Sequence, residues 1–172
     1  MPGLVILPAG ENFMKCHLFA VLLALAMTCF AIGADGARYA TVERAIDGDT
    51  VVLVGGERIR LLGVDTPELH HPSKPVQCYA EEARRFSRSM VENKQVKLTF
   101  EGPLKDRYGR TPAWVWYGDK YSRLLNADLI EEGYGFSYRK YPTSKVEEFN
   151  RMERKAREAG RGMWAPDACK NF

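Results

Sequence analysis

The sequence lacks several features that would place it in a specialised class of protein. Its longest apolar run, residues 18–32, is shorter than the ~20 residues that cross a bilayer. No repeat or low-complexity segment occurs after residue 36, which argues against a repeat protein. An excess of one charge is also lacking, because 25 basic and 22 acidic residues give a net charge of +3. Such a charge tolerates a polyanionic partner but does not identify one.

What is present describes one globular domain behind an export signal. Hydrophobic residues make up 45% of the 172 residues and charged residues 27%, a balance typical of a folded domain. Met14-Lys15, the apolar run and Gly33-Ala34 form the pattern of a secretory signal peptide, with a buried helix or an uncleaved membrane anchor as alternatives. We expect a signal peptide over residues 1–34, with Met14 as an alternative start, and a secreted or periplasmic domain over 35–172.

Cleavage after residue 34 would leave two cysteines, Cys78 and Cys169. Export permits a disulfide between them. Pairing also requires Cα atoms within about 7 Å of each other, and the sequence does not give that distance. A disulfide and two free thiols are therefore equal alternatives.

Strand patterns come first along the domain, and helical patterns fall between and after them. Gly55-Gly56 is a hairpin signal, Gly133 marks a helix end, and Ser144 with Glu147 has the spacing of a capping box. The expected strands are 39–44, 50–54, 57–64, 96–100 and 113–117, and the expected helices are 79–91, 122–132 and 144–159. This order predicts an α+β, mainly β protein built on a small barrel or curled sheet.

Four acidic residues lie at two points that the hairpin brings together. Asp47 and Asp49 flank Gly48 before the first hairpin strand, and Asp65 and Glu68 follow the second. An Asp-Gly pair alone is a common turn, in which glycine supplies a positive φ. Residues two apart on a strand face the same way, so both aspartates can point to one site. Hard oxygen ligands suit calcium, and the lack of histidine and cysteine among them argues against zinc.

Two arginines have the chemistry to balance these acids. Several like charges need a counter-charge, or their pKa values rise. Arg60 lies on the returning strand, and Arg110 ends the segment 106–110. Guanidinium groups bind phosphate in a bidentate manner and stay charged. Either arginine alone is an ordinary strand or turn residue, but both beside a metal–carboxylate cluster predict a clamp for a phosphodiester.

Three fragments in this order resemble the staphylococcal nuclease (thermonuclease) family. They are Ala-Ile-Asp-Gly-Asp-Thr-Val at 45–51, Arg-Leu-Leu-Gly-Val-Asp-Thr-Pro-Glu at 60–68 and Asp-Arg-Tyr-Gly-Arg at 106–110. The resemblance implies a five-stranded oligonucleotide-binding barrel with about three packed helices. It also implies a calcium-dependent enzyme that hydrolyses DNA and RNA at the P–O5′ bond and leaves 3′-phosphate ends. We expect a monomer that favours single strands and has no stable membrane association.

The resemblance assigns roles to individual residues. Asp49 and Asp65 would ligate calcium through carboxylates, and Thr66 through its backbone carbonyl. Glu68 would be the general base that activates water. The expected catalytic residues are Arg60, Glu68 and Arg110, and the expected substrate-binding residues are Asp47, Lys74, Arg107, Tyr108, Tyr138 and Tyr141. The two tyrosines of the loop, the last two of these, would stack on a base, with packing of the loop on the barrel as the alternative.

Two other functions compete with this one. A non-catalytic barrel that binds single-stranded nucleic acid would lack some of the catalytic or metal-binding residues, and none is missing here. A zinc site formed by His70, His71 and Cys78 is disfavoured, because adjacent residues of an extended loop face opposite sides and the spacing is not a known zinc pattern. His70 and His71 fit better as loop residues at the rim of the substrate site.

Overall fold

The computed structural model describes residues 36–69 and 75–170. The signal peptide expected over 1–34, and the positions of His70, His71 and Lys74, lie outside the described residues. Within the described ranges, every helix is too short or too polar to span a bilayer.

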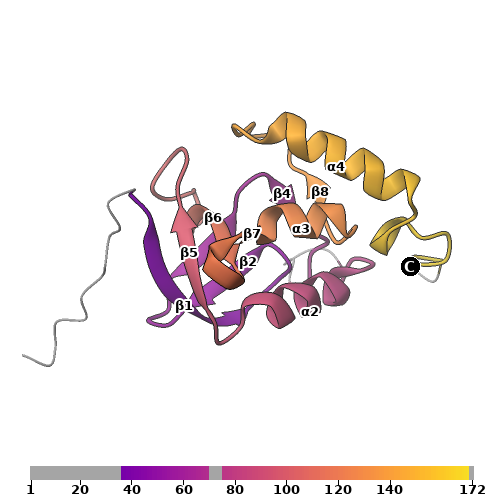
Figure 1. Ribbon diagram of the computed structural model, residues 1–172. Coiled ribbons are helices and arrows are strands. Elements are labelled where there is room, and N and C mark those ends of the chain that lie inside the picture. Colours follow the sequence, from indigo (N-terminus) through magenta and orange to yellow (C-terminus); the bar gives the residue numbers. More distant parts are fainter. Residues whose placement is uncertain (1–35, 70–74, 171–172) are drawn as a thin grey trace, which may run out of the picture. The chain divides into compact units, whose positions relative to one another are not determined.

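Five strands close into a barrel, as the sequence predicts (Figure 1). β1 pairs antiparallel with β2 and β5, β2 pairs antiparallel with β3, and β6 pairs antiparallel with β5. The barrel closes where β6 pairs in parallel with β3. The bounds are β1 (Arg38–Ala45), β2 (Thr50–Leu53), β3 (Arg58–Leu61), β5 (Gln95–Thr99) and β6 (Thr111–Tyr117). β6 thus begins two residues before its expected start and includes Pro112.

The expected hairpin joins β2 to β3 through Gly55-Gly56, and both glycines have a positive φ. The returning strand is shorter than the expected range 57–64, because the chain turns after Leu61. Val64–Asp65 then form β4, which pairs with β8 (Phe136–Ser137) in a separate two-stranded sheet. A strand from the C-terminal half of the chain therefore holds the backbone at Asp65.

Among the described residues, three α-helices accompany the barrel: α2 (Ala80–Val91), α3 (Leu125–Glu131) and α4 (Val146–Glu158). α3 begins later than expected, because Arg123–Leu124 pair with β6 as β7. The expected capping box of α4 is wrong. The backbone N–H and the hydroxyl of Ser144 both donate to the carboxylate of Glu101, at 2.7 Å each, and no side chain caps the helix.

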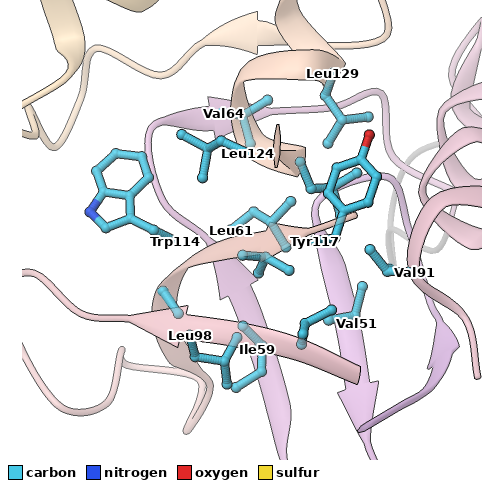
Figure 2. Packing of buried hydrophobic residues seen from close by; sticks show 14 of the residues in the cluster. Val51, Ile59, Leu61, Val64, Val91, Leu98, Trp114, Tyr117, Leu124 and Leu129 are labelled. Carbon is cyan, nitrogen blue, oxygen red and sulfur yellow. The ribbon is translucent and has the colours of Figure 1, made fainter. Parts of the chain in front are cut away.

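Alternating apolar residues of the strands fill the barrel. Val51, Ile59, Leu61 and Leu98 point into one cluster that Leu129 of α3 joins (Figure 2). All five are essentially inaccessible to solvent. Burial of one such side chain contributes about 1.5–3 kcal/mol, so the ends of these strands are rigid supports for polar residues.

A disulfide joins Cys78, just before α2, to Cys169 in the C-terminal tail, with Cα atoms 5.7 Å apart. The structure thus decides between the two alternatives for these cysteines. The tail is docked independently as well, since the Met163 N–H donates to the Gly133 carbonyl and the Trp164 ring lies edge-on to Phe136 at 5.3 Å.

Candidate active site

The bend at Asp47-Gly48-Asp49 packs tightly against α2. A Cβ atom on Gly48 would lie 2.7 Å from the Cγ2 atom of Thr66 and 2.8 Å from the Cβ atom of Ala83. Gly48 lies in the bend but does not have a positive φ, so the explanation of this glycine by a positive φ is wrong. Close packing requires it instead, and this packing brings the first acidic segment against the second.

Asp49 is buried at the base of the site. One carboxylate oxygen accepts the Thr66 N–H at 2.9 Å and lies 3.2 Å from Nη2 of Arg60. The other oxygen accepts the hydroxyl of Thr50 at 3.0 Å. Asp49 therefore links the start of β2 directly to the loop that follows β4.

The Arg60 guanidinium bridges two carboxylates. Its Nη2 atom lies 2.7 Å from Asp65 Oδ1 as well as 3.2 Å from Asp49 Oδ2. Its Nη1 atom donates to the carbonyls of Leu61 and Val64, both at 2.7 Å. The turn that shortens β3 supplies these carbonyls, so the local fold fixes the orientation of the guanidinium.

The turn after β5 fixes the second arginine. Asp106 accepts the N–H groups of Tyr108 and Arg110 at 2.9 Å each, and the Nε atom of Arg110 at 2.8 Å. Burial raises the pKa of Asp106, but these hydrogen bonds outweigh burial, so the pKa lies below its usual value. Asp106 is a positioning residue that the sequence analysis missed. The sequence pattern that could have revealed it is an aspartate at the start of a tight turn, where its side chain accepts backbone N–H groups of the turn.

A cavity of about 360 Å³ gathers the arginine and tyrosine side chains. Six of the expected site residues line this arginine cavity: Arg60, Arg107, Tyr108, Arg110, Tyr138 and Tyr141. The Tyr138 and Tyr141 rings lie 5.9 Å apart, and the Tyr138 ring lies 5.7 Å from the Arg60 Cζ atom. Guanidinium groups and exposed rings around one cavity have the chemistry to bind a nucleotide.

The acids Asp47, Asp49, Asp65 and Glu68, here the acidic cluster, lie beyond Arg60 and do not line the cavity. Burial, followed by the charges of Asp49, Asp47 and Asp65, raises the pKa of Glu68. Burial and the charge of Asp49 likewise raise the pKa of Asp65, against the opposing charges of Arg60 and Arg110. Burial and mutual repulsion thus both disfavour the ionised forms of Asp65 and Glu68.

A hard cation fits the chemistry of this cluster. The donors are carboxylate and backbone oxygens, and the buried Oγ1 atom of Thr66 has no hydrogen-bond partner in the part of the chain that the structure describes. Within that same part, no three carboxylate, imidazole or thiol groups are close enough to hold a metal by themselves. The residues that would hold a cation are thus Asp49 and Asp65, helped by the Thr66 carbonyl and by water.

Gln77 holds the backbone of Glu68, and the sequence analysis missed it. The Gln77 N–H donates to the Glu68 carbonyl at 3.0 Å, and the Glu68 N–H donates to Oε1 of Gln77 at 2.9 Å. The next residue is Cys78, which carries the disulfide. No pattern in the sequence marks this glutamine, because its role arises only where the chain folds back on itself.

Comparisons with known proteins agree with this geometry. The sequence model of the family described as "Staphylococcal nuclease homologue" matches residues 58–166. The thermonuclease of Staphylococcus intermedius is 44% identical over 95 residues, which cover 54% of this chain and 55% of that protein. The thermonuclease of Staphylococcus hyicus is 35% identical over 128 residues, covering 72% and 74%. Endonuclease YncB of Bacillus subtilis is 34% identical over 131 residues, covering 73% and 61%. The chain thus spans about half to three quarters of these relatives.

Proposed function

The chain belongs to the staphylococcal nuclease family, and we propose that it is a calcium-dependent nuclease that hydrolyses phosphodiester bonds in DNA and RNA. One observation carries the proposal. The Arg60 guanidinium lines the same cavity as Arg110 and also contacts Asp49 and Asp65. Arg60 therefore connects the phosphate-binding side chains of the cavity to carboxylates that can ligate a metal ion. The names of the thermonuclease and endonuclease relatives support the same class of enzyme.

The two arginines would bind the phosphate that is attacked. Both are held before substrate arrives, Arg60 by backbone carbonyls and Arg110 by Asp106. Donors placed in advance stabilise the transition state, because negative charge grows there on the phosphoryl oxygens and the donors need no reorganisation. In other phosphoryl-transfer enzymes such an arginine is worth on the order of 10³–10⁵ in rate.

Glu68 would accept a proton from the attacking water. Burial and its acidic neighbours raise its pKa, which makes the ionised carboxylate a stronger base. Gln77 bonds both backbone polar groups of Glu68, so the carboxylate starts from a fixed position. We propose that the reaction breaks the P–O5′ bond and leaves 3′-phosphate ends.

Calcium is the proposed cation. Asp49, Asp65 and the Thr66 carbonyl would hold it, because hard oxygen donors and two carboxylates match its preference. When bound, calcium polarises a phosphoryl oxygen and orients substrate and water. Its charge would also oppose burial and the neighbouring carboxylates, which raise the pKa values of Asp65 and Glu68.

The tyrosines would select accessible bases. Tyr108 and Tyr141 are more than half exposed at the arginine cavity, and Tyr138 lies beside Tyr141. Stacking of a base on an aromatic ring is worth about 1–3 kcal/mol and requires an unpaired base, so single strands would be favoured. Asp47, Lys74 and Arg107 complete the proposed substrate contacts.

We also propose that the enzyme works as a monomer in a secreted or periplasmic compartment. The disulfide between Cys78 and Cys169 supports the compartment in this proposal, because disulfides persist in oxidising compartments. The apolar run 18–32, followed by the small residues Gly33-Ala34, also supports export.

A barrel that binds nucleic acid without cutting it is the competing function. Incubation of a labelled single strand with the protein and calcium, followed by electrophoresis, distinguishes the two. A nuclease yields shorter products, whereas a shifted but intact strand would favour the binding module. The double variant Arg60→Ala, Arg110→Ala, prepared in parallel, should leave the strand intact, and this controls for contaminating nucleases.

A further inference from the structure

We propose that the outer face of β1, β5 and β6 carries a second binding site, for single-stranded nucleic acid. A hollow of about 310 Å³ lies there, lined by Tyr39, Lys97, Thr99, Trp116, Lys120 and Tyr121. None of the residues of this aromatic hollow lines the arginine cavity. This inference rests on the proposed function in one respect, the choice of single-stranded nucleic acid as the ligand.

Strand register builds the floor of the aromatic hollow. Lys97 of β5 is paired with Tyr39 of β1 on one side and with Trp116 of β6 on the other. Paired residues of neighbouring strands point to the same face of a sheet, so a ring, a lysine and a second ring stand in one row. The flanking residues Val96 and Leu98 are fully buried in the barrel. The row therefore faces outward.

The short turn η1 (Asp119–Tyr121) forms the rim. The ring of Tyr121 lies 5.2 Å from that of Tyr39, and its hydroxyl donates to Oε1 of Gln95 at 2.7 Å. Lys120 and Tyr121 have φ values of 50° and 56°, a left-handed conformation that is costly for residues other than glycine. Strain of this kind persists where contacts hold it and clusters at ligand-binding sites.

The chemistry of the aromatic hollow matches a single strand. Rings stack on any base, and lysines neutralise the adjoining phosphates, so the combination binds without sequence preference. The indole N–H of Trp116 donates to the Thr99 hydroxyl at 2.9 Å, which orients the ring beside Lys97. Asp119 is the acid of the rim turn, and no acid lines the hollow among the described residues. A duplex would offer no free base to these rings.

β6 connects the two sites. Pro112 near its start lines the arginine cavity, and Trp116 near its end lines the aromatic hollow. Four residues of a strand span about 13 Å, so the two sites are close in space. A strand that extends a few nucleotides from the cleaved bond would therefore reach the hollow, and long substrates should bind more tightly than short ones.

The test is the affinity of a fluorescently labelled oligothymidylate for the full chain in a calcium chelator, measured by anisotropy. Tyr121→Ala should weaken binding by roughly fivefold to 100-fold, because one base loses the ring on which it stacks. Lys120→Glu should weaken it as well and reduce its dependence on salt. Tyr121→Phe, which keeps the ring, and Lys155→Glu, an exposed lysine of α4, should bind like the wild type.

Wild-type affinity in both Tyr121→Ala and Lys120→Glu would overturn the proposal. Because the measurement needs no cleavage, its result stands even if the protein proves not to be a nuclease. Conversely, if the wild type cuts DNA while the hollow variants bind normally, only the second site fails. Circular dichroism of each variant establishes that a loss of affinity is not a loss of fold.

Discussion

The arginine cavity with its acidic cluster and the aromatic hollow differ in the charges that they combine. The first sets guanidinium groups against carboxylates whose pKa values are raised, and holds them by buried hydrogen bonds. The second holds rings and lysines without a lining acid in the described residues. Opposed charges can move protons and stabilise a transition state, whereas rings and cations can only bind. The difference indicates that cutting and holding a strand are separate properties of this barrel.

The largest expected effect is the loss of cleavage when an arginine of the arginine cavity is removed. Arg110→Ala should lower kcat by about 10³–10⁵, because a preorganised donor to the phosphoryl group is lost. Arg60→Ala should have a similar effect, since it also abolishes the bridge between Asp49 and Asp65. Steady-state cleavage of a short oligonucleotide measures both. Near-normal turnover in either variant would contradict the assigned roles. Lys155→Ala, which also removes one positive charge, from an exposed position of α4, is the matched control.

Loss of the disulfide should weaken the side of the molecule that carries Glu68. Cys78→Ser with Cys169→Ser should lower the free energy of unfolding by about 2–4 kcal/mol, because the cross-link restricts the unfolded chain. Urea denaturation measures the change. Dithiothreitol should produce the same loss in the wild type and none in the double variant. Equal stability of the oxidised wild type and the variant would contradict the expected contribution of the cross-link.

Gln77 offers a finer test within the candidate active site. Gln77→Ala should lower kcat roughly tenfold, equivalent to about 1.4 kcal/mol, because the backbone N–H of Glu68 loses the side-chain oxygen that accepts it. KM should change little, since Gln77 does not line the arginine cavity. Gln77→Glu, which keeps an acceptor oxygen, should recover part of the rate. A change confined to KM would assign Gln77 to substrate binding instead.

The smallest expected effect is on the stability of the metal-free protein, through the negative charge of the acidic cluster. A carboxyl group whose pKa is higher in the folded than in the unfolded protein opposes folding when it is ionised. Glu68→Gln should therefore stabilise the metal-free protein at pH 7, by a fraction of a kcal/mol after solvent screening. The gain should disappear as the pH falls through the raised pKa toward the ordinary range of glutamate. Thermal unfolding in a chelator at several pH values measures the gain, and a destabilised variant would show that the ionised Glu68 does not oppose folding.

The sequence predicts what depends on local pattern and on one hairpin. The five-stranded barrel, the three helices and the closeness of Asp49 to the second acidic segment all follow from alternation, turn residues and family motifs. The sequence does not reveal partners that are distant along the chain. Ser144 bonds Glu101 rather than capping its helix, and β4 pairs with β8, although the two strands lie in different halves of the chain.

The same limit explains the aromatic hollow. Tyr39, Lys97 and Trp116 carry no motif, and they form a row only through the register of three strands. Gln77 likewise meets Glu68 only because the chain returns to that point. Side chains that act through tertiary contacts become visible when the fold is known, whereas the acids and arginines are recognisable by their chemistry and order.

Digestion of DNA and RNA with and without calcium, followed by analysis of the product ends, is the decisive measurement for the proposed function. We expect rapid cleavage of both nucleic acids in calcium, 3′-phosphate and 5′-hydroxyl ends, and loss of cleavage in a calcium chelator with recovery when calcium is restored. Cleavage that persists in the chelator, or products with 5′-phosphate ends, would contradict it.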